Sequence, residues 1–379
     1  MSLVLIGLAG VVLVAVLFLV TRKSGGAHPG SPRSAPALTP VELAPVAAGH
    51  VAARTDLALP LHPAALPPAA LAGFEWRRAE DLPEASRQGL LAELRRLPPP
   101  SRALHQLVSP QFVARASSAE LSELVIGEPQ VAARVLARVN SSLYGLQTPV
   151  SSIGQAVTFL GLNSVRSICL QYMLSASFKA DTPAQQRHFD AIWAASAVAS
   201  ELCFKLAQQL RLPDPGGMVT QLVLSFLGHF AAAARMPPER LLAADQGLLA
   251  RTRAEQELLG LPAAEIGGLL LTEWALPAAL VADVVDIDRL LAAAPQAQTS
   301  PRAATLAVCY LSARLGEKLA RGEPVDLLVF DPRAAQDPDF FWLAGLLEQP
   351  RLARLPELLR GPELVRAVQT MLAGMKRPA

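Results

Sequence analysis

The chain has 379 residues, a formal net charge of +2, 51% hydrophobic residues and only 5% aromatic residues. This length can hold two modest domains, or one domain with extensions. A net charge so near zero gives no electrostatic footprint for nucleic acid, so we expect no nucleic-acid partner. Alanine and leucine dominate the composition, which favours helices over sheets. We therefore predict an all-α fold.

The chain begins with an uncharged apolar run from Leu3 to Val20. At about 1.5 Å per residue, this run nearly crosses the hydrocarbon core of a bilayer. Arg22 and Lys23 follow it, and basic residues hold their flank in the cytoplasm. A cleaved signal peptide is the alternative, but it would have a positive residue before the run. We predict that residues 1–22 are a single transmembrane anchor and that the rest is cytoplasmic.

The remaining chain divides by composition. Residues 23–68 are rich in proline and alanine and are predicted to be a flexible linker. Residues 69–96 are predicted to be a charged helical segment, and residues 97–302 carry a series of helical patterns that form a multi-helix bundle. Residues 303–379 are predicted to be a mostly helical extension. Within the extension, the apolar run 325–330 is either a strand or a buried loop.

Three cysteines are scattered among apolar helical stretches, at positions 169, 203 and 309. They lack the spacing of a metal site and cannot all pair with one another. We expect buried, reduced thiols. We also expect no cofactor.

The most informative segment runs from Glu128 to Gly161, where one defined turn separates two helical patterns. The residues that define it begin and end helices or shape the turn, and they are Pro129, Asn140, Ser141, Tyr144, Gly145, Pro149 and Gly161. Proline suits the first position of a helix, and glycine suits its end. An asparagine can clamp a buried loop with its amide. Structural roles are sufficient for Asn140 and Tyr144, and direct contact with a ligand is the alternative.

This segment resembles the HDOD family, a bacterial all-helical signalling module. The resemblance extends through Ser152-Ile153, Ala156-Val157 and Leu160-Gly161, and more weakly from about Leu97 to Arg302. It implies an HDOD-type helical bundle and a bacterial inner-membrane location for the predicted anchor. HDOD modules are related to HD phosphohydrolases, whose histidine and aspartate ligands hold catalytic metal ions.

The positions that would carry those ligands are degenerate in this chain. By the resemblance, they fall at Ala195, at Ser225-Phe226 in place of the His-Asp pair, and at Ala263. His229 lies close by, and we interpret it as a structural histidine, since one imidazole makes a poor metal site. Asp283, Asp286 and Asp288 form an acidic cluster that we interpret as a solvated helix face.

The resemblance and the missing ligands together predict a non-catalytic, membrane-tethered regulatory scaffold that binds protein partners. No catalytic, cofactor-binding or metal-binding residue is predicted. An active metal-dependent phosphohydrolase is one alternative, and a nucleotide sensor that keeps the vacant pocket is another. Self-association into a homo-oligomer is a further alternative to binding a different protein.

Overall fold

The structure is a computed structural model that describes residues 67–141, 144, 146–241, 247–292, 301–334 and 337–375. These residues form helices joined by turns and contain no strand, which confirms the predicted all-α fold. They belong to one compact unit, Arg54–Ala379. The predicted anchor and nearly all of the predicted linker lie outside the described residues. The run 325–330 contains a turn at 327–329 and no strand, so the strand alternative is wrong. The buried-loop alternative holds only in part, because Leu327 is buried whereas Leu328 and Val329 are exposed.

The segment before the bundle contains a short 3₁₀ helix and one α-helix and is anchored to the bundle by side chains. The Trp76 indole donates a hydrogen bond to Glu265 Oε1 over 2.8 Å, and Gln256 Oε1 accepts one from the Arg77 backbone over 3.0 Å. The predicted charged segment therefore packs on later helices. Its elements are η1 (Ala79–Asp81) and α1 (Glu84–Leu94).

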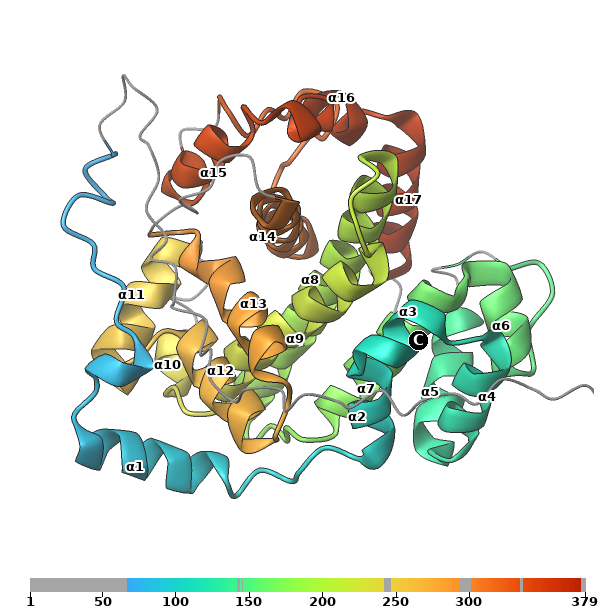
Figure 1. Cartoon of the computed structure of the whole chain (residues 1–379), viewed down its shortest axis with the longest axis horizontal. Helices are drawn as coiled ribbons and strands as arrows, with labels where there is room; N and C mark the ends of the chain where they lie inside the picture. Colours follow the sequence, from blue (N-terminus) through green and yellow to red (C-terminus); the bar gives the residue numbers. More distant parts are fainter. Residues whose placement is uncertain are drawn as a thin grey trace, which may run out of the picture. The chain divides into compact units, whose positions relative to one another are not determined.

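Six short and medium helices follow, on one side of the unit in Figure 1. Ser117 and Glu120 form the predicted capping box at the start of α4, with hydrogen bonds of 3.2 and 2.7 Å. Helix α5 begins at Pro129, as predicted. The bounds are α2 (Arg102–Val108), α3 (Pro110–Arg115), α4 (Ser118–Ile126), α5 (Pro129–Val139), α6 (Ile153–Leu160) and α7 (Leu162–Ser175).

Two long helices, α8 (Pro183–Gln209) and α9 (Pro215–Ala233), run through the centre of the unit (Figure 1). Helix α9 is long and apolar enough to cross a membrane, with a mean hydropathy of 1.3, but 89% of its apolar window is buried against other helices. The burial explains the hydropathy, because a core helix is apolar all round. Helix α9 therefore gives only weak evidence for a membrane span.

The remaining helices surround α8 and α9. Helix α14 packs along α8, α12 packs along α9, and α17 lies beside α8 (Figure 1). The division at residue 302 stays a prediction, although α14 begins at that point and packs into the same core. The bounds are α10 (Pro238–Leu241), α11 (Leu248–Leu259), α12 (Ala263–Glu273), α13 (Ala278–Arg289), α14 (Pro301–Ala320), η3 (Pro338–Phe340), α15 (Phe341–Leu346), η4 (Pro350–Leu352), α16 (Leu355–Leu359) and α17 (Pro362–Met375).

Two glycines fix how these helices meet. Gly161 links α6 to α7 with φ at +82°, a conformation that L residues rarely adopt. Gly228 allows α9 to approach α12 closely, since a Cβ atom at this position would lie 2.2 Å from the Ala263 carbonyl oxygen. This approach brings α9 and α12 together beside the buried centre of the bundle.

Candidate functional site

The four degenerate positions lie in the interior of the bundle. Ala195 is on α8, Ser225 and Phe226 are on α9, and Ala263 begins α12, and all four are buried. Ala195 and Phe226 line one cavity of about 30 Å³ together with His229. Ser225 Oγ instead donates a hydrogen bond to the Leu222 carbonyl oxygen over 2.8 Å, within its own helix. At these four positions the side chains are therefore either apolar or, for Ser225, already hydrogen-bonded within their own helix.

A cluster of buried ionisable residues lies beside this cavity, with four of its six members in the cavity wall, and we call it the ion cluster. It contains two arginines, one histidine and three carboxylates, contributed by α9, α11, α13 and α14. Its members are His229, Arg251, Glu255, Asp288, Arg314 and Glu317. All six are buried, which is unusual for charged side chains unless they are paired.

Short contacts connect the ion cluster. Arg251 Nη2 donates a hydrogen bond to Glu317 Oε1 over 2.7 Å, and Arg314 Nη2 donates one to Asp288 Oδ1 over 3.1 Å. Arg314 also lies 3.5 Å from Glu317 Oε1, so the two pairs join. Each arginine therefore has a carboxylate partner, which is the condition for holding buried charges stably.

Glu255 and His229 complete the ion cluster. Glu255 Oε2 accepts a hydrogen bond from the Ala263 backbone N–H over 2.7 Å, which ties α11 to the start of α12. His229 Nε2 lies 3.0 Å from Asp288 Oδ2. His229 Nδ1 has no hydrogen-bond partner among the described residues. A cavity of about 30 Å³ is large enough for one water molecule, which would suit this polar wall.

The two arginines lower the pKa values of two of the three carboxylates in the ion cluster. Burial alone would raise the pKa of Glu317, but Arg251 and Arg314 outweigh it and lower that pKa to about 2. Asp288 shows the same balance, with Arg314 and His229 holding its pKa below the ordinary value against burial. For Glu255 burial wins, and its pKa is raised. Asp288 and Glu317 are therefore ionised at neutral pH and neutralise the arginines.

This chemistry does not fit a catalytic divalent metal ion. Such an ion needs several converging histidine or carboxylate ligands and an open position for water. In the ion cluster, the carboxylates of Asp288 and Glu317 are already neutralised by guanidinium groups, which would repel a metal cation. In the described part of the chain, no group of three or more histidine, cysteine, aspartate or glutamate side chains is placed to hold a metal ion.

One interpretation made from the sequence needs correction here. Asp286 and Asp288 do not form a solvated face, because both are buried: Asp286 pairs with Arg289 and Arg302, and Asp288 pairs with Arg314. Arg289 lies three residues from Asp286 on the same helix, but Arg302 and Arg314 lie on α14, so helical periodicity alone could not reveal those two partners. The structural role of His229 stays a prediction, and the structure places this residue in the ion cluster beside Asp288.

The motif loop after α5 forms a second feature, held by Asn140. The Asn140 side chain donates a hydrogen bond to the Val150 carbonyl oxygen over 2.8 Å and accepts one from the Val150 N–H over 2.7 Å. This is the loop clamp proposed from the sequence. Ser141 Oγ donates to the Arg138 carbonyl oxygen over 2.6 Å. Pro149 directly precedes the clamped residue, whereas Gly145 lies outside the described residues.

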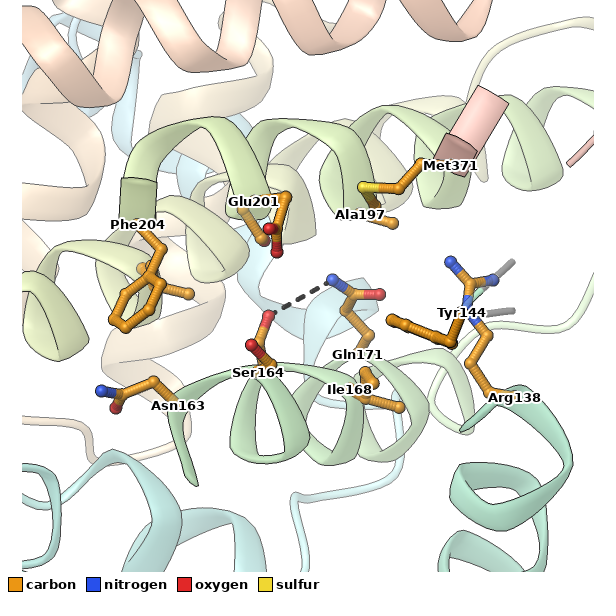
Figure 2. Close-up of a pocket in the computed structure, with 13 residues that line it drawn as sticks. Arg138, Tyr144, Asn163, Ser164, Ile168, Gln171, Ala197, Glu201, Phe204 and Met371 are labelled. Atoms are coloured by element: carbon orange, nitrogen blue, oxygen red, sulfur yellow. Dashed lines mark hydrogen bonds between the residues drawn. The ribbon is translucent and has the colours of Figure 1, made fainter. Parts of the chain in front are cut away.

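Tyr144 faces a small pocket between α7 and α8, shown in Figure 2. Glu201 and Phe204 of α8 line one side, and Ile168 and Gln171 of α7 line the other. Met371 of α17 packs near Tyr144 and Ala197, so the C-terminal helix closes one end of the pocket. Burial raises the pKa of the Tyr144 hydroxyl, which is therefore protonated at neutral pH. With a volume of about 30 Å³, the pocket has no room for more than water.

The helical architecture and the ion cluster define the class of the protein: an all-helical bundle whose centre carries arginine–carboxylate pairs. The HDOD domain family model matches residues 97–288, and the chain belongs to the HDOD family. The predicted family is thereby confirmed, while two members of the ion cluster, Arg314 and Glu317, lie beyond the matched residues.

The chain is also similar to solved structures. An HDOD domain protein with unknown function from Geobacter sulfurreducens is 18% identical, with a TM-score of 0.55; the match covers 77% of this chain and 98% of that one. A "Putative phosphohydrolase" from Shewanella amazonensis is 21% identical, with a TM-score of 0.48 and coverage of 75% and 96%. At 18% identity the likeness to the Geobacter protein shows the fold alone, and no argument rests on the second likeness. No curated protein matches the chain.

Proposed function

We propose that this protein is a non-catalytic regulatory scaffold that acts by binding other proteins. The ion cluster carries the proposal. Where a metal-dependent relative would need ligands, Ala195 and Phe226 line a cavity of about 30 Å³. Arg251 and Arg314 neutralise the carboxylates beside it. The family fold is intact while ion pairs occupy its centre. We therefore place the function on the surfaces of the bundle, which would bind the protein partners.

The ion cluster and the small cavity also argue against the two alternatives, a metal-dependent phosphohydrolase and a nucleotide sensor that uses this cavity. Hydrolysis of a phosphoester by this superfamily requires metal-activated water, and in the ion cluster Asp288 and Glu317 are already paired with arginines. A nucleotide needs a pocket of several hundred Å³, and the cavity is far smaller. The central cavity therefore supports neither turnover nor nucleotide sensing.

We further propose that residues 1–22 tether the scaffold to the inner membrane. The uncharged run Leu3–Val20 followed by Arg22 and Lys23 supports this. A tether of about 45 residues would confine the domain near the bilayer and raise its effective concentration for a membrane-associated partner.

Cross-linking in cells followed by mass spectrometry tests the scaffold proposal. The full chain should yield reproducible cross-links from the helical unit to at least one other protein, and these links should weaken when Leu3–Val20 is deleted. Cross-links found only between copies of this chain, repeated across growth conditions, would replace partner binding with self-assembly.

A further inference from the structure

A separate groove on the surface of the bundle has the size and charge of a small-molecule site. It lies between α5, α7 and the first half of α8 and has a volume of about 630 Å³. This is within the range of pockets that hold cofactor-sized ligands. We call it the basic groove, and the residues used below are Arg134, Arg138, Gln171, Tyr172, Lys179 and Trp193.

Three cations line the basic groove without carboxylate partners. Arg134 and Arg138 are one turn apart on α5, and Lys179 lies between α7 and α8. Like charges at this helical spacing repel each other. Among the described residues no carboxylate lies within ion-pair distance of any of the three. One acidic side chain, Asp190, also lines the groove, and its carboxylate accepts a hydrogen bond from Gln186 over 2.9 Å. The groove thus carries an excess of positive charge that an anion would neutralise.

Aromatic rings form another part of the wall of the basic groove. The guanidinium of Arg134 lies 6.0 Å from the centre of the Tyr172 ring, and the Trp193 ring lies 4.5 Å from that of Phe230. Phe230 also packs against Phe178 and Phe189, so Trp193 is supported by a rigid buried cluster. Trp193 itself is only partly buried and lines the groove. A fixed, accessible ring next to cations suits a ligand with a planar ring and a negative group.

We propose that the basic groove binds an organic anion of nucleotide size. Its phosphate groups would lie on Arg134, Arg138 and Lys179, because guanidinium and ammonium groups are the strong donors to phosphate oxygens. Its planar ring would lie against Trp193, and the Gln171 side chain, which also lines the groove, would contact its polar edge. The proposal goes beyond the scaffold function and uses a site distinct from the ion cluster.

The basic groove is connected to the motif loop. Arg138 lines both the groove and the Tyr144 pocket, and its carbonyl oxygen accepts the hydrogen bond from Ser141. The positive charge of Arg138 also lowers the pKa of Tyr144 in part, against the larger effect of burial. An anion on Arg138 would therefore act on the residues that hold the loop, giving the scaffold a ligand-dependent surface.

Calorimetric titration of the full chain in detergent tests the proposal, with AMP and UMP as probes and adenosine as the probe without phosphate. We expect saturable binding of at least one mononucleotide, quenching of tryptophan fluorescence that is lost in Trp193→Phe, and no comparable binding of adenosine. The double variant Arg134→Ala/Arg138→Ala should bind at least about tenfold more weakly, the effect of losing charge-assisted contacts. Arg187→Ala, an exposed arginine of α8 outside the groove, should bind like the unchanged chain.

Thermal unfolding of the same samples separates a lost site from a lost fold. The mononucleotide should raise the midpoint of the unchanged chain and of Arg187→Ala but not of the double variant, since a ligand that binds only the folded state stabilises it. No saturable binding of either mononucleotide, or equal affinity in the double variant, would overturn the proposal. Binding of poly-glutamate alone would also overturn it and make the groove a docking surface for acidic protein segments.

Discussion

Replacing Arg314 by methionine removes one cation from the ion cluster and keeps a side chain of similar length. Arg314 lies 3.1 Å from Asp288 and 3.5 Å from Glu317, and only 1% of its side chain is exposed. Without it, two buried carboxylates keep only Arg251 and His229 as partners. Removing one member of a buried pair costs about 3–5 kcal/mol, because the remaining charge stays desolvated.

The lowered pKa of Glu317 shows how strongly its charged form is stabilised in the ion cluster. It falls from an ordinary value of 4.5 to about 2, and the difference of 2.5 at about 1.4 kcal/mol per unit corresponds to about 3 kcal/mol. Arg251 contributes more to this stabilisation than Arg314, so the loss of Arg314 removes only part of it. A folded-state pKa below the unfolded value gives stability that is present above pH 4.5 and is lost as the pH falls from 4.5 towards 2. The unchanged chain should lose stability over this window, and Arg314→Met should lose less of it.

Urea unfolding followed by tryptophan fluorescence measures both effects, because all four tryptophans lie in the unit Arg54–Ala379. Arg95→Met is the matched control, since Arg95 pairs with Glu273 at the surface, and its midpoint should barely change. Adding Asp288→Asn to Arg314→Met should recover part of the loss. A loss below about 1 kcal/mol for Arg314→Met, the size expected of a surface pair, would refute the reasoning.

Three further substitutions test the framework by the same unfolding assay. Asn140→Ala removes both hydrogen bonds to Val150 and should cost about 1 kcal/mol, the low end for a lost pair, because Asn140 is largely exposed; an unchanged midpoint would show that the clamp is dispensable. Gly161→Ala should cost about 1–2 kcal/mol because φ is +82°, and a more stable variant would contradict this. Gly228→Ala should cost about 3 kcal/mol, because the added Cβ would push α9 away from Ala263 of α12. Gly89→Ala is the control, since Gly89 has open space around it, and this change should be neutral or stabilising. Equal effects of the two substitutions would contradict the close approach of α9 and α12.

Local sequence signals predicted the helical framework well. Proline at 129, the Ser117–Glu120 box and glycine at 161 each act within one helical turn, so the ends of α4, α5 and α6 follow from nearby residues. The clamp by Asn140 was also predictable, because a loop of about ten residues needs partners for its backbone.

The ion cluster could not be predicted in the same way. Asp288 is paired with Arg314, which lies on a different helix, and nothing in the local pattern of α13 marks the carboxylate as buried. Arg251 and Glu317 are likewise distant in sequence and meet only because α11 and α14 pack at the same centre. From sequence alone, acidic residues with helical spacing are therefore interpreted as a solvated face, and only their partners on other helices reveal that they are buried.

Metal analysis of the purified full chain tests the central claim most directly. The chain should be produced with added manganese and iron, purified without chelators and measured by inductively coupled plasma mass spectrometry. The ion cluster predicts far less than one divalent metal ion per chain. A content near one ion per chain that falls when Asp288 or His229 is replaced would contradict the account, because the centre of the bundle would then be a metal site.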